Sequence, residues 1–315
     1  MNGIRNITIV GAGTMGHSLA QSFAQAGYAV RLHDLSDEIL TRAKRLIASN
    51  LRTLVEAGLL EGSGQIPTLD RIRTTTDIVD AGEQADFVIE AASEDKAAKK
   101  EIFRTLDKIC PPGAILASNT SYLDIFQFIE TGRPDRLLIT HWFAPPHLVP
   151  LVEIVRGPQT SQETVDRIRE LLIALGKKPI VISKFLPGFI ANRLQSALTN
   201  EAFHLLDNGY ATPEEIDMAV KSSFGLRIPI LGAVKRMDYG GLDLAQKIIA
   251  NAQYQPPARR TCSKTVDALV NQGKLGVKSG SGFYEYGGRS PEEIMKERDL
   301  KLIKLKKFLT EIGEL

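Results

Sequence analysis

The sequence contains only two cysteines among its 315 residues, Cys110 and Cys262, and they lie far apart in the chain. A disulfide framework requires several cysteines, and a zinc site requires ligands at short spacings such as CxxC. The sequence therefore favours neither a disulfide-stapled protein nor a zinc protein, and we expect no metal at the functional site.

An excess of charge of one sign is missing as well. Lys and Arg total 39 and Asp and Glu total 37, which leaves a formal net charge of +2, and the basic residues are scattered along the chain. Proteins that bind nucleic acids usually carry a basic patch or stripe. We therefore expect no nucleic-acid partner.

Long hydrophobic runs are also absent. The apolar stretch at residues 137–152 contains three prolines and two histidines, whereas a transmembrane helix needs about 20 consecutive, mostly apolar residues. A strand-like segment from Ile7 to Val10 begins a few residues into the chain, which leaves no room for the regions of a signal peptide. We therefore expect no association with a membrane, and a cytoplasmic location.

What the sequence does contain is the pattern of a folded α/β protein. Hydrophobic residues make up 43% and charged residues 24%, and at about 150 residues per domain the length corresponds to roughly two domains. The first half alternates short β-branched segments with helical patterns, which predicts a mostly parallel sheet covered by helices. The predicted strands are residues 7–10, 29–34, 87–91, 114–118, 137–141, 151–155 and 180–182.

The domain boundaries follow from changes in this pattern. Residues 39–57 have the period of a long helix and predict a helical insertion in the sheet domain, whereas strand patterns nearly disappear after about residue 187. We predict a Rossmann-like domain at residues 1–185, an all-helical domain at 186–288 and a tail helix at 289–315. An apolar stripe on the tail helix should be buried against this chain or a second copy. It consists of Met295, Leu302, Leu305, Leu309 and Ile312.

A GxGxxG motif at residues 11–16 follows the first predicted strand and opens a helical pattern. Glycines at these positions permit a tight turn and a close approach of the backbone to a pyrophosphate, which the helix N-terminus attracts. Asp34 ends the next strand, 23 residues after Gly11, near the spacing of the acid that binds the adenosine ribose. No arginine follows it, so NAD is favoured over NADP. The predicted cofactor-binding residues are Gly11, Gly13, Thr14, Met15, Gly16 and Asp34.

Two carboxylates, Glu90 and Glu153, interrupt segments that should be buried, and a buried carboxylate requires a partner. For Glu153 the candidate is His141, 12 residues earlier at the end of another predicted strand. A histidine held by a carboxylate is oriented in one tautomer and suits a general base. The alternative is a core histidine bonded to a backbone carbonyl and an edge-strand glutamate in water. Glu90 is counted with the predicted cofactor-binding residues.

Several ordered motifs together resemble the L-3-hydroxyacyl-CoA dehydrogenase family, over about residues 5 to 286. This family includes 3-hydroxybutyryl-CoA dehydrogenases and enzymes of free 3-hydroxy acids, such as L-gulonate 3-dehydrogenase (lambda-crystallin) and carnitine dehydrogenase. The motifs are GAGTMG at 11–16, SNTSYL at 118–123, HWFAPPHLVPLVEIV at 141–155, PGFIANR at 187–193, DYGGLD at 238–243 and KSGSGFYEY at 278–286.

The resemblance implies a Rossmann-like domain, a helical domain that makes a homodimer, and a site in the cleft between them. His141 is similar to the family's catalytic base and Glu153 to the carboxylate that orients it. Ser118 is similar to the serine that hydrogen-bonds the substrate, Asn192 to an asparagine of the polar pocket, and Lys278 to a lysine that contacts the cofactor. The implied activity is NAD-dependent oxidation of an L-3-hydroxyacyl-CoA, in fatty acid metabolism.

The chain also departs from the family pattern. Ala144 stands where the family commonly has an asparagine that contacts the cofactor, and Val149-Pro150 stands where the CoA enzymes often have Met-Lys. Residues 46–95, which include the insertion that holds CoA in the family, contain only three basic residues, Arg52, Arg71 and Arg73. Two alternatives therefore stay open: the same chemistry on a free 3-hydroxy acid, and a crystallin-like NAD-binding protein without turnover.

Overall fold

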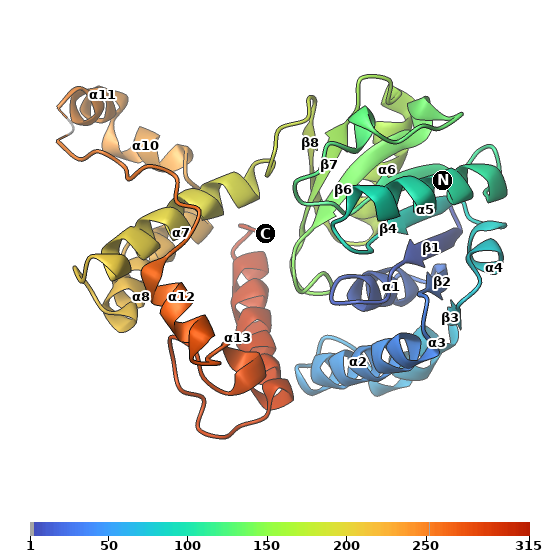
Figure 1. Cartoon of the computed structure of the whole chain (residues 1–315), viewed down its shortest axis with the longest axis horizontal. Helices are drawn as coiled ribbons and strands as arrows, with labels where there is room; N and C mark the ends of the chain where they lie inside the picture. The colour runs from blue at the N-terminus through green and yellow to red at the C-terminus, as the bar shows by residue number, and fades with distance from the viewer. Residues whose placement is uncertain (1–2, 252) are drawn as a thin grey trace. The chain divides into compact units, whose positions relative to one another are not determined.

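The computed structural model describes residues 3–251 and 253–315. The chain divides into two compact units, of which the first ends at Ile190 and the second is Ala191–Leu315 (Figure 1). The first unit combines a sheet with helices, and the second is built from helices. Each unit is described by itself below.

The first unit is built on one eight-stranded sheet, in the order β3-β2-β1-β4-β5-β6-β7-β8. All neighbouring strands are parallel except β6 and β7, which pair antiparallel. The mostly parallel sheet predicted from the sequence is confirmed, with one additional short strand, β3. The strands are β1 (Asn6–Val10), β2 (Ala29–His33), β3 (Ile72–Thr75), β4 (Phe87–Glu90), β5 (Ile115–Ser118), β6 (Leu137–Trp142), β7 (Leu151–Arg156) and β8 (Lys178–Ile182).

The strand order reverses at β1, which pairs with β2 on one side and with β4 on the other. Right-handed crossovers that leave this point in opposite directions place their helices on opposite faces of the sheet. The helices α1 (Gly16–Gln25) and α5 (Lys96–Ile109) therefore cover different faces. A crevice for a ligand is expected where the carboxyl ends of β1, β2 and β4 meet.

The predicted insertion between the second and third expected strands contains two helices. The first, α2 (Asp37–Glu56), begins at Ser36, whose side chain accepts a hydrogen bond from the amide of Glu38. A short 3-10 turn at Gly62–Gly64 then leads into α3 (Gln65–Asp70). The remaining helices of this unit are α4 (Ile78–Gly82) and α6 (Gln162–Ala174).

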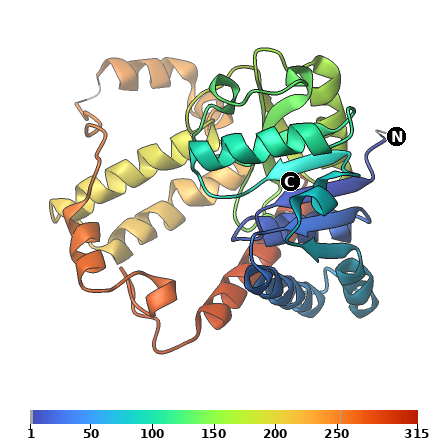
Figure 2. The ribbon, with the colours of Figure 1, turned by 45° about the vertical axis from the view of Figure 1, so that its right-hand side comes forward.

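The second unit is helical, as Figure 2 also shows. Its second helix starts with a capping box, in which the Thr212 hydroxyl accepts from the Glu215 amide and the Glu215 carboxylate accepts from the Thr212 amide. The segment Thr-Pro-Glu-Glu at 212–215 has the sequence pattern of such a helix start. The helices are α7 (Ala191–Asp207), α8 (Pro213–Ser222), α9 (Phe224–Leu231), α10 (Lys235–Gly240), α11 (Leu242–Ala250), α12 (Lys264–Asn271) and α13 (Pro291–Glu311).

The apolar stripe of the tail helix is only partly covered within the single chain. Met295, Leu302, Leu305 and Ile312 stay between 38% and 47% exposed in the single chain. The buried apolar side chains of α13 are Ile303 and Leu309, because the covered face follows a different row of side chains from the one chosen by apolar spacing alone. Four of the five residues of the stripe are thus not buried within this chain, and their burial against a second copy stays a prediction.

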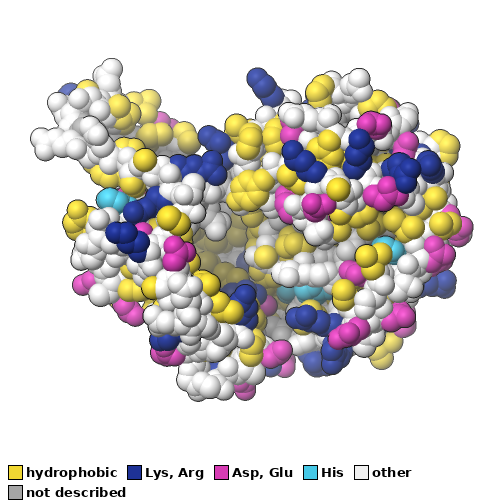
Figure 3. Space-filling view, viewed as in Figure 1, with side chains coloured by type: hydrophobic (Ala, Val, Ile, Leu, Met, Phe, Trp, Pro, Cys, Tyr) yellow, Lys and Arg dark blue, Asp and Glu magenta, His cyan; other side chains and the backbone are white. Residues whose placement is uncertain are grey.

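Charged side chains of both signs are intermixed on the face of the molecule drawn in Figure 3. Within the described residues, no helix is long and apolar enough to cross a membrane.

Candidate functional site

The GxGxxG turn between β1 and α1 contains two glycines that no other residue could replace without rearrangement. Gly11 has a φ of +100°, and a Cβ there would lie 2.7 Å from the carbonyl carbon of Ala91. A Cβ on Gly16 would lie 1.7 Å from the Gly11 carbonyl oxygen. A Cβ on Gly13, in contrast, would meet no protein atom within 4 Å. The backbone at Gly13 is thus open toward a ligand.

Asp34 lies at the end of β2, beside this turn. Its Oδ2 accepts a hydrogen bond of 2.7 Å from the Ala12 amide, and its Oδ1 accepts one of 2.8 Å from the Leu35 amide. Two amide donors orient the carboxylate, and each oxygen keeps a lone pair for a further donor. Leu35, the next residue, is 88% exposed and offers no positive charge. The arrangement suits a ribose diol and disfavours a 2′-phosphate.

A cavity of about 790 Å³ lies beside these residues. This volume is within the range of small-molecule and cofactor sites. The turn contributes Gly11, Gly13, Thr14 and Met15. With Asp34, five of the six predicted cofactor-binding residues of this region border the cavity. Further lining residues come from the ends of β2 and β4 and from α5, among them His33, Ala91 and Ile102.

His33, at the edge of this cavity, is only 4% exposed. Burial lowers the pKa of its imidazole below the ordinary 6.5, although the charges of Asp34 and Asp77 and the Thr76 backbone oppose this shift. The unfolded chain therefore takes up a proton below pH 6.5 before the folded chain does. The neutral His33 therefore contributes to the free energy of unfolding. This contribution is fully present above the pKa of the unfolded chain and is lost as the pH falls toward the lower pKa of the folded chain.

We expect His33→Leu to flatten the pH dependence of Tm between about pH 7.5 and about pH 5.5, because the substituted residue binds no proton in either state. Thermal unfolding at several pH values measures this slope, with His204→Gln on α7 as the control. An unchanged slope in His33→Leu, equal to that of the control, would contradict the assignment.

His141 and Glu153 face each other on the antiparallel strands β6 and β7, where they are directly paired in register. His141 Nδ1 lies 2.8 Å from Glu153 Oε2, and the two residues are 3% and 0% exposed. With the proton on Nδ1 donated to the carboxylate, Nε2 carries the lone pair. The bonded pair predicted from the spacing of 12 residues is present, and the alternative with a solvated glutamate is wrong.

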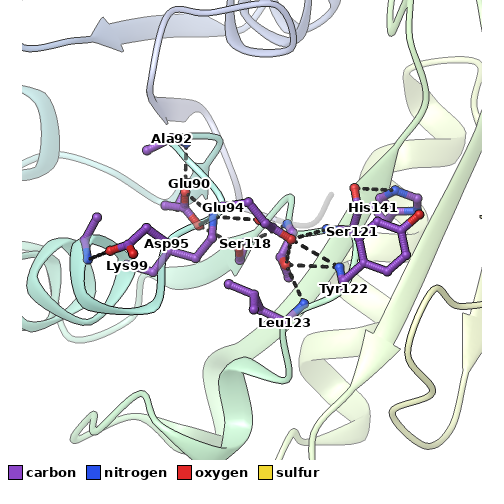
Figure 4. Close-up of polar contacts among 12 residues, drawn as sticks. Glu90, Ala92, Glu94, Asp95, Lys99, Ser118, Ser121, Tyr122, Leu123 and His141 are labelled. Atoms are coloured by element: carbon purple, nitrogen blue, oxygen red, sulfur yellow. Dashed lines mark hydrogen bonds and ion pairs between the residues drawn. The ribbon is translucent and has the colours of Figure 1, made fainter. Parts of the chain in front are cut away.

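The serine whose hydroxyl lies within hydrogen-bond distance of His141 is Ser121, not Ser118. The Ser121 hydroxyl lies 3.3 Å from His141 Nε2. Ser118 is fully buried, and its hydroxyl donates to Glu90 Oε2 at 2.6 Å. The chain turns after β5, so the residue three positions further on reaches the histidine. A direct contact of Ser118 with a substrate has no support in this geometry, in which its hydroxyl bonds to Glu90 (Figure 4).

Glu90 is enclosed by protein donors. Lys99 Nζ lies 2.7 Å and 2.8 Å from its two carboxylate oxygens, and the Ala92 amide donates to Oε1 at 2.8 Å. Both partners of the ion pair are buried, at 0% for Glu90 and 1% for Lys99. A direct contact between the Glu90 carboxylate and a cofactor has no support in this geometry. Lys99 is the partner that the buried carboxylate required, and sequence reasoning missed it.

Glu94 extends this network to the turn that carries Ser121. Its Oε1 accepts hydrogen bonds from the Thr120 hydroxyl and from the amides of Ser121 and Tyr122, and its Oε2 lies 3.4 Å from Lys99 Nζ. Burial acts to raise the pKa of Glu94, but these hydrogen bonds and the Lys99 charge outweigh it and lower the pKa. A charged Glu94 therefore fixes the turn next to His141 (Figure 4).

The loop between β6 and β7 is held from two sides. The Ser18 hydroxyl on α1 lies 2.7 Å from His147 Nδ1 and accepts the His147 amide at 3.1 Å. On the other side, Lys177 Nζ donates to the carbonyls of Pro146 and Val149. These contacts connect the end of β6, where His141 lies, to the helix that starts at the glycine turn.

The other two predicted site residues belong to the second unit. Asn192 is half-buried in the first turn of α7, and Lys278 is exposed in the 3-10 turn Val277–Ser279. Their roles toward substrate and cofactor stay predictions. Within the described residues, no group of three or more His, Cys, Asp or Glu side chains could hold a metal ion.

Two sequence models of known protein domains match the chain. Residues 6–185 match the sequence model described as 3-hydroxyacyl-CoA dehydrogenase, NAD binding domain, and residues 188–286 match that of the 3-hydroxyacyl-CoA dehydrogenase C-terminal domain. The chain is 37% identical over 292 residues to a probable 3-hydroxybutyryl-CoA dehydrogenase of Bacillus subtilis, covering 90% of this chain and 98% of that protein.

A second relative has a different substrate in its name. The chain is 32% identical over 307 residues to 5-formyl-3-hydroxy-2-methylpyridine 4-carboxylate 5-dehydrogenase of Mesorhizobium japonicum, covering 97% of this chain and 98% of that protein. A crystal structure of an enzyme of this name, described as an NAD⁺-dependent dismutase, superimposes with a TM-score of 0.87 at 32% identity over 98% of this chain and 99% of the other.

Proposed function

The chain belongs to the 3-hydroxyacyl-CoA dehydrogenase family, and from this we propose that it oxidises the 3-hydroxyl group of an L-3-hydroxyacyl-CoA, such as 3-hydroxybutyryl-CoA, to a ketone. It is an NAD-dependent oxidoreductase of the 3-hydroxyacyl-CoA dehydrogenase type. The observation that carries the proposal is the buried bond between His141 and Glu153, in the same unit as the cavity at the glycine turn.

The residues at the carboxyl ends of β1 and β2 fit NAD. The open backbone at Gly13 and the start of α1 suit its pyrophosphate, since a helix N-terminus attracts anions. Asp34, oriented by two amides, suits the hydroxyls of the adenosine ribose. When bound, NAD supplies the hydride acceptor.

The proton leaves the substrate hydroxyl by way of His141. Nε2 takes this proton as a general base, and the Glu153 carboxylate stabilises the resulting imidazolium through Nδ1–H. The Ser121 hydroxyl, 3.3 Å from Nε2, lies where it can donate a hydrogen bond to the same substrate oxygen. Glu94 keeps this serine in place through the Ser121 amide. We assign Asn192 to the substrate pocket and Lys278 to the cofactor as part of this proposal.

A second candidate is the same oxidation on a free acid instead of a CoA thioester. The pyridine-carboxylate dehydrogenase matches 97% of this chain, whereas the family models end at residue 286. Three arginines are the only basic residues in positions 46–95, and CoA carries phosphates that require cationic partners. These observations favour a small hydroxy acid, aliphatic or aromatic, as the competing substrate class.

The formation of NADH, followed by absorbance, separates these candidates. We expect 3-hydroxybutyryl-CoA to give the fastest turnover in a panel that also contains L-gulonate, carnitine and a hydroxymethyl pyridine carboxylate. Turnover of the free acids alone would replace the proposed substrate with the second candidate. NAD binding without turnover of any compound would leave a crystallin-like binding protein. The assay of each substrate is repeated with the His141→Gln variant, which measures the formation of NADH that does not depend on His141.

Asp34 should determine the choice of cofactor. We expect Asp34→Ala to raise the KM for NAD roughly 10- to 100-fold, the value of a hydrogen bond to a charged group, and to narrow the preference over NADP by removing a charge that repels the 2′-phosphate. Asp37→Ala, in the exposed first turn of α2, is the control. Equal KM values for NAD and NADP in the parent enzyme would refute the assignment.

We further propose that the protein is a homodimer that pairs through its helical unit. Several large apolar side chains of this unit are exposed in the single chain, among them Leu194, Leu198, Leu226 and Ile248, and such surfaces are typical of protein interfaces. A cytoplasmic location and a role in fatty acid metabolism stay predictions from the sequence and from the family.

A further inference from the structure

The turn that follows β8 contains the one non-glycine residue with a positive φ among the described residues, Phe189 at φ = 50°. Bulky residues rarely adopt this left-handed conformation, and they keep it only where the surroundings impose it. The turn is closed by a hydrogen bond of 2.8 Å from the Phe189 amide to the Leu186 carbonyl. Gly188, the preceding residue, is left-handed as well, at φ = 77°.

The side chain of Phe189 packs against the imidazole of His141. Their ring centroids are 5.1 Å apart, and Phe189 is 0% exposed. A second aromatic ring, Phe143, contacts the same imidazole with centroids 4.5 Å apart. Two aromatic neighbours restrict the rotation of the histidine ring about its side-chain bonds, in addition to the bond to Glu153.

The next residue holds the other member of the pair. The Ile190 amide donates to Glu153 Oε1 at 3.0 Å, while Glu153 Oε2 faces His141 Nδ1. Consecutive residues therefore contact both catalytic side chains, one through a ring and one through a backbone N–H. An extended or right-handed conformation at Phe189 would turn the Ile190 amide away from the carboxylate, because φ and ψ at one residue set the direction of the next peptide plane.

We propose that Phe189 is a positioning residue for the His141–Glu153 pair: its left-handed backbone directs the Ile190 amide onto Glu153, and its ring fixes the plane of the imidazole. The proposal rests on the proposed function, in which His141 is the base. A residue that only filled the core would influence the stability of the unit and leave the geometry of the pair unchanged.

The test compares Phe189→Ala with Phe185→Ala. Phe185 is an aromatic neighbour in the same segment, with its ring centroid 5.8 Å from that of Phe189. We expect Phe189→Ala to lower kcat roughly 10- to 100-fold, the effect of a misplaced catalytic group, with little change in the KM for NAD. Phe185 is only partly buried, so Phe185→Ala should lower Tm by less than Phe189→Ala. It should keep kcat within about twofold of the parent. Phe189→Leu, which fills most of the space, should recover kcat to within about threefold.

A readout that needs no turnover is the NMR signal of the His141 Nδ1 proton in the Glu153 hydrogen bond, assigned by its loss in His141→Gln. We expect this signal to shift or broaden in Phe189→Ala and to stay unchanged in Phe185→Ala. An unchanged signal in folded Phe189→Ala, with parallel losses of kcat in Phe185→Ala and Phe189→Ala, would overturn the proposal. Because the NMR arm is independent of the substrate, it stands even if no tested hydroxyacyl compound is oxidised.

Discussion

Replacing His141 by alanine should lower kcat by roughly 10²-fold or more, because a positioned general base contributes about that factor. The affinity for NAD should change little, since His141 does not border the cavity at the glycine turn. Single-turnover measurements of NADH formation give the rate of the chemical step, and titration with NAD gives the affinity. Glu153→Gln should also lower kcat, because an amide can hold Nδ1 but does not stabilise the charged imidazole.

The control for this experiment is His204→Ala, which removes a histidine of the helical unit. The rates of the parent, His141→Ala and His204→Ala are compared below the Tm of each protein, so that a loss of rate belongs to the reaction and not to unfolding. A His141→Ala variant that retained half of the parent activity would remove His141 from the mechanism.

The second large effect is expected for Lys99→Met, which should lower the free energy of unfolding. Replacing Lys99 by methionine leaves the buried Glu90 carboxylate without its cation, and breaking a buried ion pair in this way costs about 3–5 kcal/mol. The geometry supports the upper part of this range, because Lys99 Nζ reaches both carboxylate oxygens and both residues are at most 1% exposed. Urea unfolding of the parent and the variant measures the difference in the free energy of unfolding.

A matched surface pair provides the control. Lys100 pairs with Glu130 at 3.0 Å, with side chains 53% and 85% exposed, and exposed pairs contribute about 0–1 kcal/mol. The double variant Glu90→Gln, Lys99→Met should lose less free energy of unfolding than Lys99→Met alone, because it leaves no unpaired charge in the core. A loss in Lys99→Met no larger than in Lys100→Met would show that the buried pair is not needed for stability.

The sheet could be predicted from the sequence because its strands are short β-branched segments with helical patterns between them. The strand that was missed, β3, has the sequence Ile-Arg-Thr-Thr and lies at the sheet edge. Only its first residue is buried, so it lacks the apolar run that marked the others. The register of β6 and β7 was accessible in the same way, since a spacing of 12 residues suited two adjacent strands.

The support around the catalytic pair could not be predicted as fully. The sequence marked Glu90 as needing a partner but did not indicate Lys99, because a lysine on an amphipathic helix usually faces water. The resemblance to the family indicated Ser118 and not Ser121. The direction of the turn that carries Ser121 depends on Glu94, a contact across 27 positions. The role of Phe189 depends on a single backbone angle, for which a bulky residue gives no signal.

The antiparallel pairing of β6 and β7 also has a consequence for biosynthesis. Residues that face each other there are close in the chain, with His141 and Glu153 12 positions apart, so the loop that must close is short and its entropic cost is small. Proteins fold during translation as their domains leave the ribosome. A further contact to the pair, from the Ile190 amide to Glu153, comes from the final residue of the first unit. The bond between His141 and Glu153 can therefore form in the nascent chain once this unit has emerged, while the helical unit is still being synthesised.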